Sequence, residues 1–282
     1  MKFGVSTFLW AYPFTTAQVG LLTKIAAIGF TAVEIPLDWD VPLDIERVAD
    51  VACELNLTCS AVAMMNHTRD PIHPDPQVQQ NGMRYLRYCV DALARWGGGP
   101  IAGASYTAAG RTYLAGEDQK KREFDLAVRQ MREAAEYAAD RGVVIAMEPL
   151  NRFESSFMSK TSDGLALVEA VGHPSLGINL DTFHINIEEK RFGETIERVG
   201  KDLFHVHTCE NDRGTPGTGH IPWTEVAAAL KKIGYNRTLV IESFTTESDL
   251  LAEAAGIWHP LAPSMDQMAV EGLAFLKDTF SG

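Results

Sequence analysis

Residues 143–181 read VVIAMEPLNRFESSFMSKTSDGLALVEAVGHPSLGINLD. The segment begins with a short apolar run, continues through a polar loop and an amphipathic stretch at residues 162–171, and returns to an apolar run at residues 176–180. A strand, a helix and a second strand in this order are typical of a βαβ unit, in which the two strands are parallel. The segment therefore predicts an α/β fold.

The same alternation extends over the whole chain. We expect strands at residues 2–8, 32–35, 58–64, 100–104, 143–147, 176–180, 203–207 and 238–241. We expect helices at residues 16–28, 43–54, 78–96, 120–141, 162–171, 192–199, 223–233 and 266–280. Equal numbers of alternating strands and helices favour a closed (β/α)8 TIM barrel over an open doubly wound sheet.

Length and composition agree with a single barrel domain over residues 1–282. The chain has 282 residues, of which 46% are hydrophobic and 22% charged, so it has ample material for a core. No stretch rich in Ser and Gly divides the alternating pattern. We therefore expect one domain, with the active site at the carboxyl ends of its strands.

The balance of charge argues against two classes of partner. The chain carries 25 Lys and Arg against 37 Asp and Glu, a formal net charge of −12, so we expect neither nucleic acid nor an acidic membrane as a partner. The sequence shows no run of apolar residues long enough to cross a bilayer and no signal-peptide pattern. Its four scattered cysteines suit no disulfide framework, which favours a cytoplasmic protein.

Four successive strands end on a side chain of the kind that binds metals. The strands predicted at 143–147, 176–180 and 238–241 run into Glu148, Asp181 and Glu242, and the strand at 203–207 ends on His207. In a barrel the carboxyl ends of the strands converge on one mouth. We therefore expect three carboxylates and one imidazole around a single point, where they must bind a cation or take up protons.

This set of ligands indicates the kind of metal. Three oxygen ligands, one nitrogen and no thiolate suit Mn²⁺, with Co²⁺ or Mg²⁺ as alternatives, better than structural zinc. On a metal that prefers about six ligands, four protein ligands leave about two positions for adjacent substrate oxygens, such as a carbonyl beside a hydroxyl. Taken singly, each residue has an ordinary explanation as a cap, an ion pair or a core histidine. Their coincidence at four corresponding strand ends favours the metal site.

Other residues near the expected mouth are candidates for contacts with substrate. His205 shares a strand face with His207, and we expect it to lie beneath His207. Residues 214–219 (GTPGTG) lack the Gly-Lys-Ser/Thr of a phosphate loop, and we interpret them as a flexible loop. Six large side chains are candidates for lining a pocket, with Phe244 and Trp10 preferred: Phe8, Trp10, Met64, Met65, Tyr106 and Phe244.

An ordered series of motifs resembles a known family. The motifs are EPLNRFE at 148–154, LDTFHINIEE at 180–189, HVH at 205–207, Arg213 with GTGHIPW at 217–223, IESF at 241–244 and GIW at 256–258. Together they resemble the D-tagatose 3-epimerase (ketose 3-epimerase) family of the xylose isomerase-like barrels. The first third of the chain is similar to that family only in its general pattern.

The resemblance implies a metal site and a substrate site. It implies a divalent metal, usually manganese or cobalt, held by Glu148, Asp181, His207 and Glu242. It places Glu154, His184 and Arg213 at positions that contact the hydroxyls and the carbonyl oxygen around C1 to C3 of a ketose. It also implies a homodimer or homotetramer. This chain departs from relatives at Ser243, where proline often follows the glutamate, and at residues 61–62, where some relatives have cysteine.

The implied reaction is reversible epimerisation at C3 of free ketoses of the D-tagatose, D-fructose, D-psicose and L-ribulose class. The C3 proton becomes acidic when a metal polarises the C2 carbonyl, and its removal gives a planar cis-enediolate. Inversion needs a group on each face, and Glu148 and Glu242 are the candidates. Arg213 and His184 are candidates for stabilising negative charge on the substrate oxygens.

Three other functions use similar residues. A 1,2-isomerase or dehydratase of the same superfamily, acting on hydroxypyruvate, a tetrulose or an inosose, would use the same four ligands. A metal-dependent nuclease would need more histidines and a basic face, against which the net charge argues. A sugar-binding barrel without catalysis would keep the pocket and lose turnover. The preferred ketose, its phosphorylation and the metal used in the cell stay open at this point.

Overall fold

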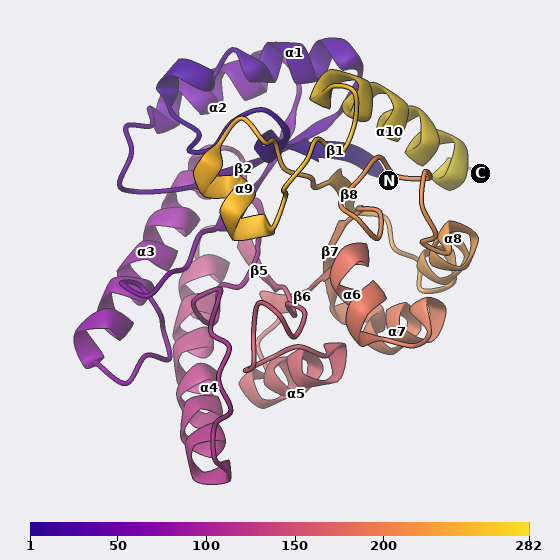
Figure 1. The fold of residues 1–282 in the computed structure, drawn as a ribbon. Helices are drawn as coiled ribbons and strands as arrows, with labels where there is room; N and C mark the ends of the chain where they lie inside the picture. The colour runs from indigo at the N-terminus through magenta and orange to yellow at the C-terminus, as the bar shows by residue number, and fades with distance from the viewer. Residues whose placement is uncertain (282) are drawn as a thin grey trace.

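Eight parallel strands form the centre of the structure, a computed structural model that describes residues 1–281. They close into a barrel in the order β1 to β8, each strand pairing with its neighbours in sequence and β1 pairing with β8 (Figure 1). The strands are β1 Lys2–Ser6, β2 Ala32–Leu37, β3 Thr58–Ala63, β4 Gly99–Ala102, β5 Val143–Met147, β6 Leu176–Asp181, β7 Leu203–His207 and β8 Thr238–Ile241. The predicted (β/α)8 barrel is confirmed.

Helices surround the barrel as an outer layer (Figure 1). The layer consists of α1 Leu21–Ile28, α2 Ile45–Glu54, α3 Pro76–Arg95, α4 Glu117–Ala139, α5 Thr161–Val171, α6 Thr182–Glu188, α7 Phe192–Val199, α8 Trp223–Lys232 and α10 Met265–Phe280, and the short helix α9 Asp249–Ala255 stands apart from it. Among the described residues, no helix is both long and apolar enough to cross a membrane. The inward faces of the helices in this layer and the strands share one large hydrophobic core, and Leu251 of α9 packs in a second, smaller cluster with Phe8 and Phe244.

Most predicted elements are present, with boundaries that differ by a few residues. β5, β7, β8 and α7 have the predicted limits. β1 ends at Ser6 instead of residue 8, because the Ser6 hydroxyl accepts a hydrogen bond from the Phe8 N–H and begins a 3-10 turn at Thr7–Leu9. Two short helices, α6 and α9, were not predicted.

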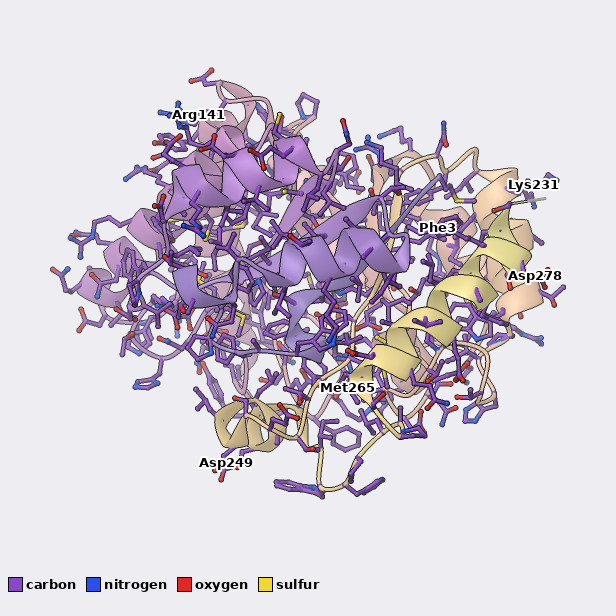
Figure 2. All side chains as sticks on the ribbon, turned by 90° about the horizontal axis from the view of Figure 1, so that it is seen from above. Phe3, Arg141, Lys231, Asp249, Met265 and Asp278 are labelled. Carbon is purple, nitrogen blue, oxygen red and sulfur yellow. The ribbon has the colours of Figure 1, made fainter. Side chains whose placement is uncertain are left out.

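The unpredicted helices both lie after strands that carry candidate ligands. α6 begins at once after β6, because the Asp181 carboxylate accepts a hydrogen bond from the Phe183 N–H at 2.7 Å and caps the helix. α9 follows β8 and lies apart from the outer layer. In Figure 2, Asp249 at the start of α9 and Arg141 just before β5 lie at opposite ends of the molecule. α9 therefore covers the end at which the strands finish.

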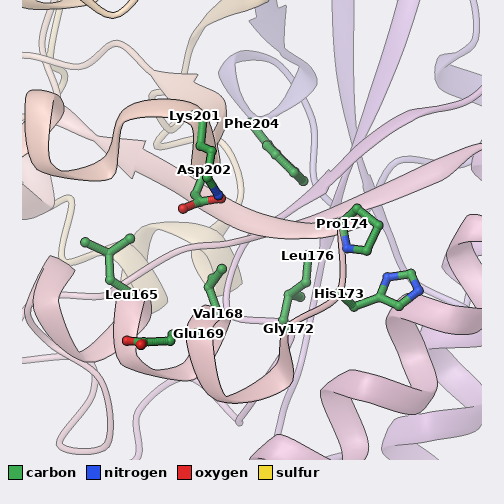
Figure 3. A pocket seen from close by; sticks show the side chains of 10 residues that line it. All are labelled: Leu165, Val168, Glu169, Gly172, His173, Pro174, Leu176, Lys201, Asp202 and Phe204. Carbon is green, nitrogen blue, oxygen red and sulfur yellow. The ribbon is translucent and has the colours of Figure 1, made fainter.

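A large groove lies at the other end of the barrel. It has a volume of about 540 Å³ and lies between α5 and the segments that lead into β6 and β7 (Figure 3). Leu165, Val168 and Phe204 form much of its apolar wall, and Lys201 and Asp202 lie at one side. None of the predicted site residues lines this groove. In barrels of this type, that end contributes to stability, and the chemistry sits at the opposite face.

Candidate metal centre

The four predicted ligands meet at the carboxyl ends of β5 to β8. One ligand atom from each of Glu148, Asp181, His207 and Glu242 lies within 4.8 Å of the others. All four side chains are buried, the most exposed being Glu242 at 5%. They come from neighbouring strands in the closed barrel, so the strand order itself brings together residues that are far apart in the chain.

Backbone contacts hold the first ligand in place. The Glu148 N–H donates to the Gly103 carbonyl at 3.1 Å, and the Tyr106 hydroxyl donates to the Glu148 carbonyl at 2.9 Å. Gly103 has φ +86°, and a Cβ there would lie 3.0 Å from the Val62 side chain and 3.2 Å from the Ala63 carbonyl. Only glycine fits this position without strain, and the loop after β4 therefore fixes the end of β5.

The electrostatics of the cluster favour a cation. Burial raises the pKa of Glu242 well above its usual value, and repulsion from Glu148 and Asp181 adds to the increase. Burial alone would lower the pKa of His207, but Glu242, Glu34 and Glu148 outweigh it and hold that pKa well above the usual range. The cluster thus retains protons unless another positive charge replaces them. Three carboxylate oxygens and one imidazole nitrogen at this separation fit a divalent cation.

Arg213 supplies one positive charge from the side. Its Nη1 donates to Asp181 Oδ2 at 2.5 Å and to Glu242 Oε2 at 3.0 Å, and its side chain is buried. Its guanidinium outweighs burial and lowers the pKa of Asp181, with further contributions from His184 and His207. Because Arg213 is buried, its ion pairs with Asp181 and Glu242 are not surface salt bridges.

The first part of the loop that carries Arg213 is packed, whereas residues 217–219 of the segment interpreted as flexible are exposed. Residues 213–216 are buried, and the buried Glu210 carboxylate accepts hydrogen bonds from the Gly217 N–H at 2.8 Å and the Trp223 Nε1–H at 2.6 Å. Arg213 itself has φ +65°, a left-handed conformation that is rare outside glycine. The Ser243 hydroxyl donates to the Arg213 carbonyl at 2.6 Å. Strain of this kind persists only where the surroundings hold it, and it is common at functional sites.

We expect Ser243→Ala to lower the free energy of unfolding by about 1–3 kcal/mol, because it leaves the buried Arg213 carbonyl without its donor. Denaturant unfolding measures the change. Ser156→Ala is a matched control, since the Ser156 hydroxyl donates to the Arg111 carbonyl at 3.0 Å in an exposed position, where water replaces it at a cost within about 0.5 kcal/mol. Equal effects of the two substitutions would contradict the role of Ser243.

His184 and Glu154 also lie at the site. His184 Nδ1 accepts the Asn151 backbone N–H at 3.1 Å, so a neutral His184 carries its proton on Nε2. That nitrogen faces the cluster, at 3.8 Å from Glu148 Oε1 and 3.9 Å from Asp181 Oδ2. The Asn151 amide also donates to Glu154 Oε1 at 2.8 Å. Asn151, which sequence reasoning missed, therefore positions both predicted substrate contacts.

A cavity of about 150 Å³ opens beside the cluster. Its polar wall holds Glu148, Glu154, His184, Arg213 and Glu242. Its opposite wall is apolar and includes Phe8, Val62, Met64, Met65 and Phe244, with Leu251, Ala254 and Ala255 of α9. The cavity thus joins two of the predicted metal ligands, Glu148 and Glu242, with the predicted polar substrate contacts in one space.

Trp10 and Tyr106 do not line this cavity. The Trp10 Nε1–H donates to Asp266 Oδ1 at 2.7 Å, and the Lys24 ammonium lies over its ring. The turn that ends β1 therefore directs Trp10 toward α1 and α10, while Phe8 enters the cavity. Tyr106 is fully buried behind Glu148. The structure brings Phe244 to the cavity and does not bring Trp10.

A second buried cluster lies beneath the first. His205 Nε2 lies 2.8 Å from Glu34 Oε2, in the position under His207 that its place on β7 predicts. His207 and His205 outweigh burial and lower the pKa of Glu34. Glu34 was missed by sequence reasoning, although a charged residue inside the apolar strand AVEIPL is a signal, because such residues are rarely buried without a partner.

Comparison with known proteins identifies the family. The xylose isomerase-like TIM barrel model matches residues 22–279. The chain is 32% identical to a probable ketose 3-epimerase of Synechocystis sp. over 99% of this chain and 97% of that protein, and 30% identical to an L-ribulose 3-epimerase of Methylomonas sp. over 99% and 98%.

The solved structures agree with this comparison. The crystal structure of a D-allulose 3-epimerase from Methylomonas sp. in complex with D-allulose is 30% identical to this chain, with a TM-score of 0.93 over 99% of this chain and 97% of that one. The match spans both the barrel and the loops that carry the cluster. The chain therefore belongs to the ketose 3-epimerase family of the xylose isomerase-like TIM barrels.

Proposed function

We propose that this protein is a metal-dependent ketose 3-epimerase that interconverts free ketoses at C3. The observation that carries the proposal is the convergence of Glu148 and Glu242 on one buried point beside a cavity lined by His184 and Arg213. The relatives named as ketose 3-epimerases cover the whole chain and support it.

Glu148, Asp181, His207 and Glu242 would hold the cation, with Mn²⁺ the preferred ion and Co²⁺ or Mg²⁺ as alternatives. When bound, a divalent cation supplies Lewis acidity that makes the proton beside the substrate carbonyl more acidic. Asp181 and His207 serve only as ligands in this scheme. The two glutamates have a second task.

Glu148 and Glu242 are placed to move the proton at C3. They extend from β5 and β8, which are separated in the barrel by β6 and β7, so they reach the site from different sides. One carboxylate removes the proton from one face of C3, and the other returns a proton to the opposite face of the planar enediolate. In the reverse direction the two residues exchange roles. Inversion at C3 follows without any redox step.

The remaining polar residues orient the sugar and stabilise its charge. The Arg213 guanidinium and the His184 Nε2–H are donors that face the cluster, and they would stabilise negative charge that develops on the substrate oxygens. Glu154, held by Asn151, would accept a hydroxyl proton. The apolar wall formed by Phe8, Phe244 and α9 reduces the access of water to the enediolate.

A substrate panel tests this function. Purified protein with Mn²⁺ should convert D-tagatose, D-fructose, D-psicose and L-ribulose into their C3 epimers, and chelator should stop the conversion. In D₂O, an epimerase places deuterium at C3 of the ketose, whereas a 1,2-isomerase labels C2 of an aldose product. Deuterium at C2, or binding of these sugars without any product, would contradict the proposal.

We further propose that the protein acts in the cytoplasm as a homodimer or homotetramer. All four cysteines are free, which suits a reducing compartment. The loops after β4 and β5 are joined by a bridge between Arg111 and Ser155, and each exposes a large apolar side chain, Leu114 and Phe153, that suits contact with a second copy. Light scattering after size-exclusion chromatography measures the oligomeric state.

A further inference from the structure

A buried carboxylate of β2 faces the side of His207 that does not point at the metal site. Glu34 is fully buried inside the barrel. Its Oε2 accepts a hydrogen bond from the Ser60 hydroxyl at 3.0 Å and lies 2.8 Å from His205 Nε2. Its Oε1 lies 3.0 Å from His207 Nε2. The carboxylate thus joins β3 and β7 across the interior of the barrel.

The two nitrogens of His207 have different surroundings. Nδ1 lies 3.2 Å from Glu148 Oε1 and 3.5 Å from Glu242 Oε2, so it is the nitrogen that faces the metal site, and the Asn179 amide nitrogen also lies 3.1 Å from it. Nε2 faces Glu34 alone. The two atoms are close but not aligned as a formed hydrogen bond, and neither His207 Nε2 nor Glu34 Oε1 has another hydrogen-bond partner among the described residues. Glu34 Oε1 is therefore the acceptor that is available to a proton on His207 Nε2.

The chemistry of these groups selects one form of the ring. A neutral imidazole carries its proton on one nitrogen, and an ionised carboxylate only accepts hydrogen bonds. Opposite Glu34, the proton therefore belongs on Nε2, which leaves the Nδ1 lone pair free for a metal ion. Groups that fix a ligating histidine in this way change metal affinity by about 10–100-fold when they are replaced.

We propose that Glu34 is a positioning residue that holds His207 in the tautomer and orientation in which Nδ1 binds the metal. The proposal rests on His207 being a metal ligand, as in the proposed function, and it does not depend on which sugar is bound. Glu34 touches neither the cavity nor the substrate contacts, since it is not among the residues that line the cavity.

A competing possibility is a second metal ion. Ligand atoms of Glu34, His205 and His207 also lie within 4.8 Å of one another. However, Glu34 Oε2 is already engaged by Ser60 and His205, and all three side chains are fully buried. We therefore expect one metal ion per chain. The number of bound ions separates the two possibilities.

The test replaces Glu34 by Gln, which keeps the shape but offers one acceptor and one NH₂ group. If the NH₂ group faces His207, the ring must move its proton to Nδ1 to avoid two opposed donors, and Nδ1 then cannot bind a cation. If it faces the other way, it meets the Ser60 hydroxyl and His205. We expect Glu34→Gln to weaken Mn²⁺ binding by about 10–100-fold in calorimetric titrations of chelator-treated protein.

A spectroscopic readout separates positioning from a general loss of packing. In the Mg²⁺-loaded protein, ¹⁵N-resolved spectra of histidine should show the His207 Nε2–H proton shifted downfield by its carboxylate partner, and this shift should be lost in Glu34→Gln. Ser60→Ala is the matched control, because it removes a donor to the same carboxylate without touching His207. It should leave the shift in place and change Mn²⁺ affinity by less than about threefold.

Several results would overturn the inference. The first is an unchanged Mn²⁺ affinity together with an unchanged His207 signal in Glu34→Gln. The second is a count of two bound metal ions per chain in the unaltered protein and one in Glu34→Gln. If Glu34→Gln does not fold, Glu34→Asp tests the same point, since its carboxylate also only accepts hydrogen bonds. Glu34→Asp should keep the downfield signal of the His207 Nε2–H proton. Loss of that signal in Glu34→Asp would count against the inference. Absence of metal binding by the unaltered protein would instead contradict the proposed function itself.

Discussion

Glu242→Gln and Glu148→Gln should each lower the rate of epimerisation by about 10²–10⁴-fold, the range that a positioned acid or base contributes. Both substitutions keep the shape of the side chain and one oxygen ligand, so the loss reflects proton transfer as long as the metal stays bound. Chromatography of the ketose epimers, at Mn²⁺ concentrations that saturate each variant, measures the effect.

Isotope exchange makes this prediction specific to two bases on opposite faces. With one glutamate removed, the other still exchanges the C3 proton of the one epimer whose proton lies on its face. Each variant should therefore incorporate deuterium from D₂O at C3 of a different epimer, without forming the other. Asp181→Asn is the control, since Asp181 is proposed to act as a ligand only, and it should lose both exchange reactions together. Equal residual exchange of both epimers in the two glutamate variants would contradict the assignment.

Removal of the metal should abolish activity, and Mn²⁺ should restore it.

Removal of the metal should also make the free energy of unfolding depend on pH. The folded-state pKa values of Glu242 and His207 are both raised, so the folded, metal-free protein retains protons that the unfolded chain releases at the ordinary pKa values of about 4.3 and 6.5. Their contribution to stability is full below those values and is lost as the pH rises through the folded-state values. Asp181, whose pKa is lowered, acts only at acid pH and does not alter this window.

Thermal unfolding with and without chelator checks this expectation. Between about pH 6 and pH 9, the melting temperature of the chelated protein should fall, while that of the Mn²⁺-loaded protein should change less, because the cation takes the place of the protons. The stabilisation by metal should therefore grow with pH, and metal binding near pH 7 should release protons in calorimetry. A stabilisation that shrinks with rising pH would contradict this account of the cluster.

The sequence predicted best those strands whose apolar pattern and whose place in the barrel are marked by the same residues. The limits of β5, β7 and β8 were predicted to the residue, because each apolar run ends on a ligand side chain that marks the mouth of the barrel. The four candidate ligands were identified in the sequence for the same reason. Their joint role in metal binding and catalysis stays a prediction until the substitutions are made.

Other features were missed because short-range pattern does not encode them. Trp10 follows the first strand as a pocket residue would, but its partners are Asp266 and Lys24, from α10 and α1. Residues 214–219 contain the glycines of a mobile loop, but residues 214–216 are buried and the Gly217 N–H donates to the Glu210 carboxylate, which also accepts the Trp223 Nε1–H. For Trp10 a contact distant in sequence outweighs the local signal, and for the loop the partner is a carboxylate seven residues before Gly217, because buried polar groups must find partners wherever the fold supplies them.

The sequence alone determined the barrel and the residue types at its mouth, since alternating apolar periods and strand-end side chains are properties of neighbouring residues. The tertiary structure decided which of those side chains share a cavity, that Arg213 is buried against Asp181 and Glu242, and that Glu34 lies behind His207. These arrangements depend on closure of the barrel, which places strands such as β2 and β7 across a common interior although 171 positions separate Glu34 from His205. Packing sets the distances across that interior, and the periodicity of apolar residues along the chain does not predict them.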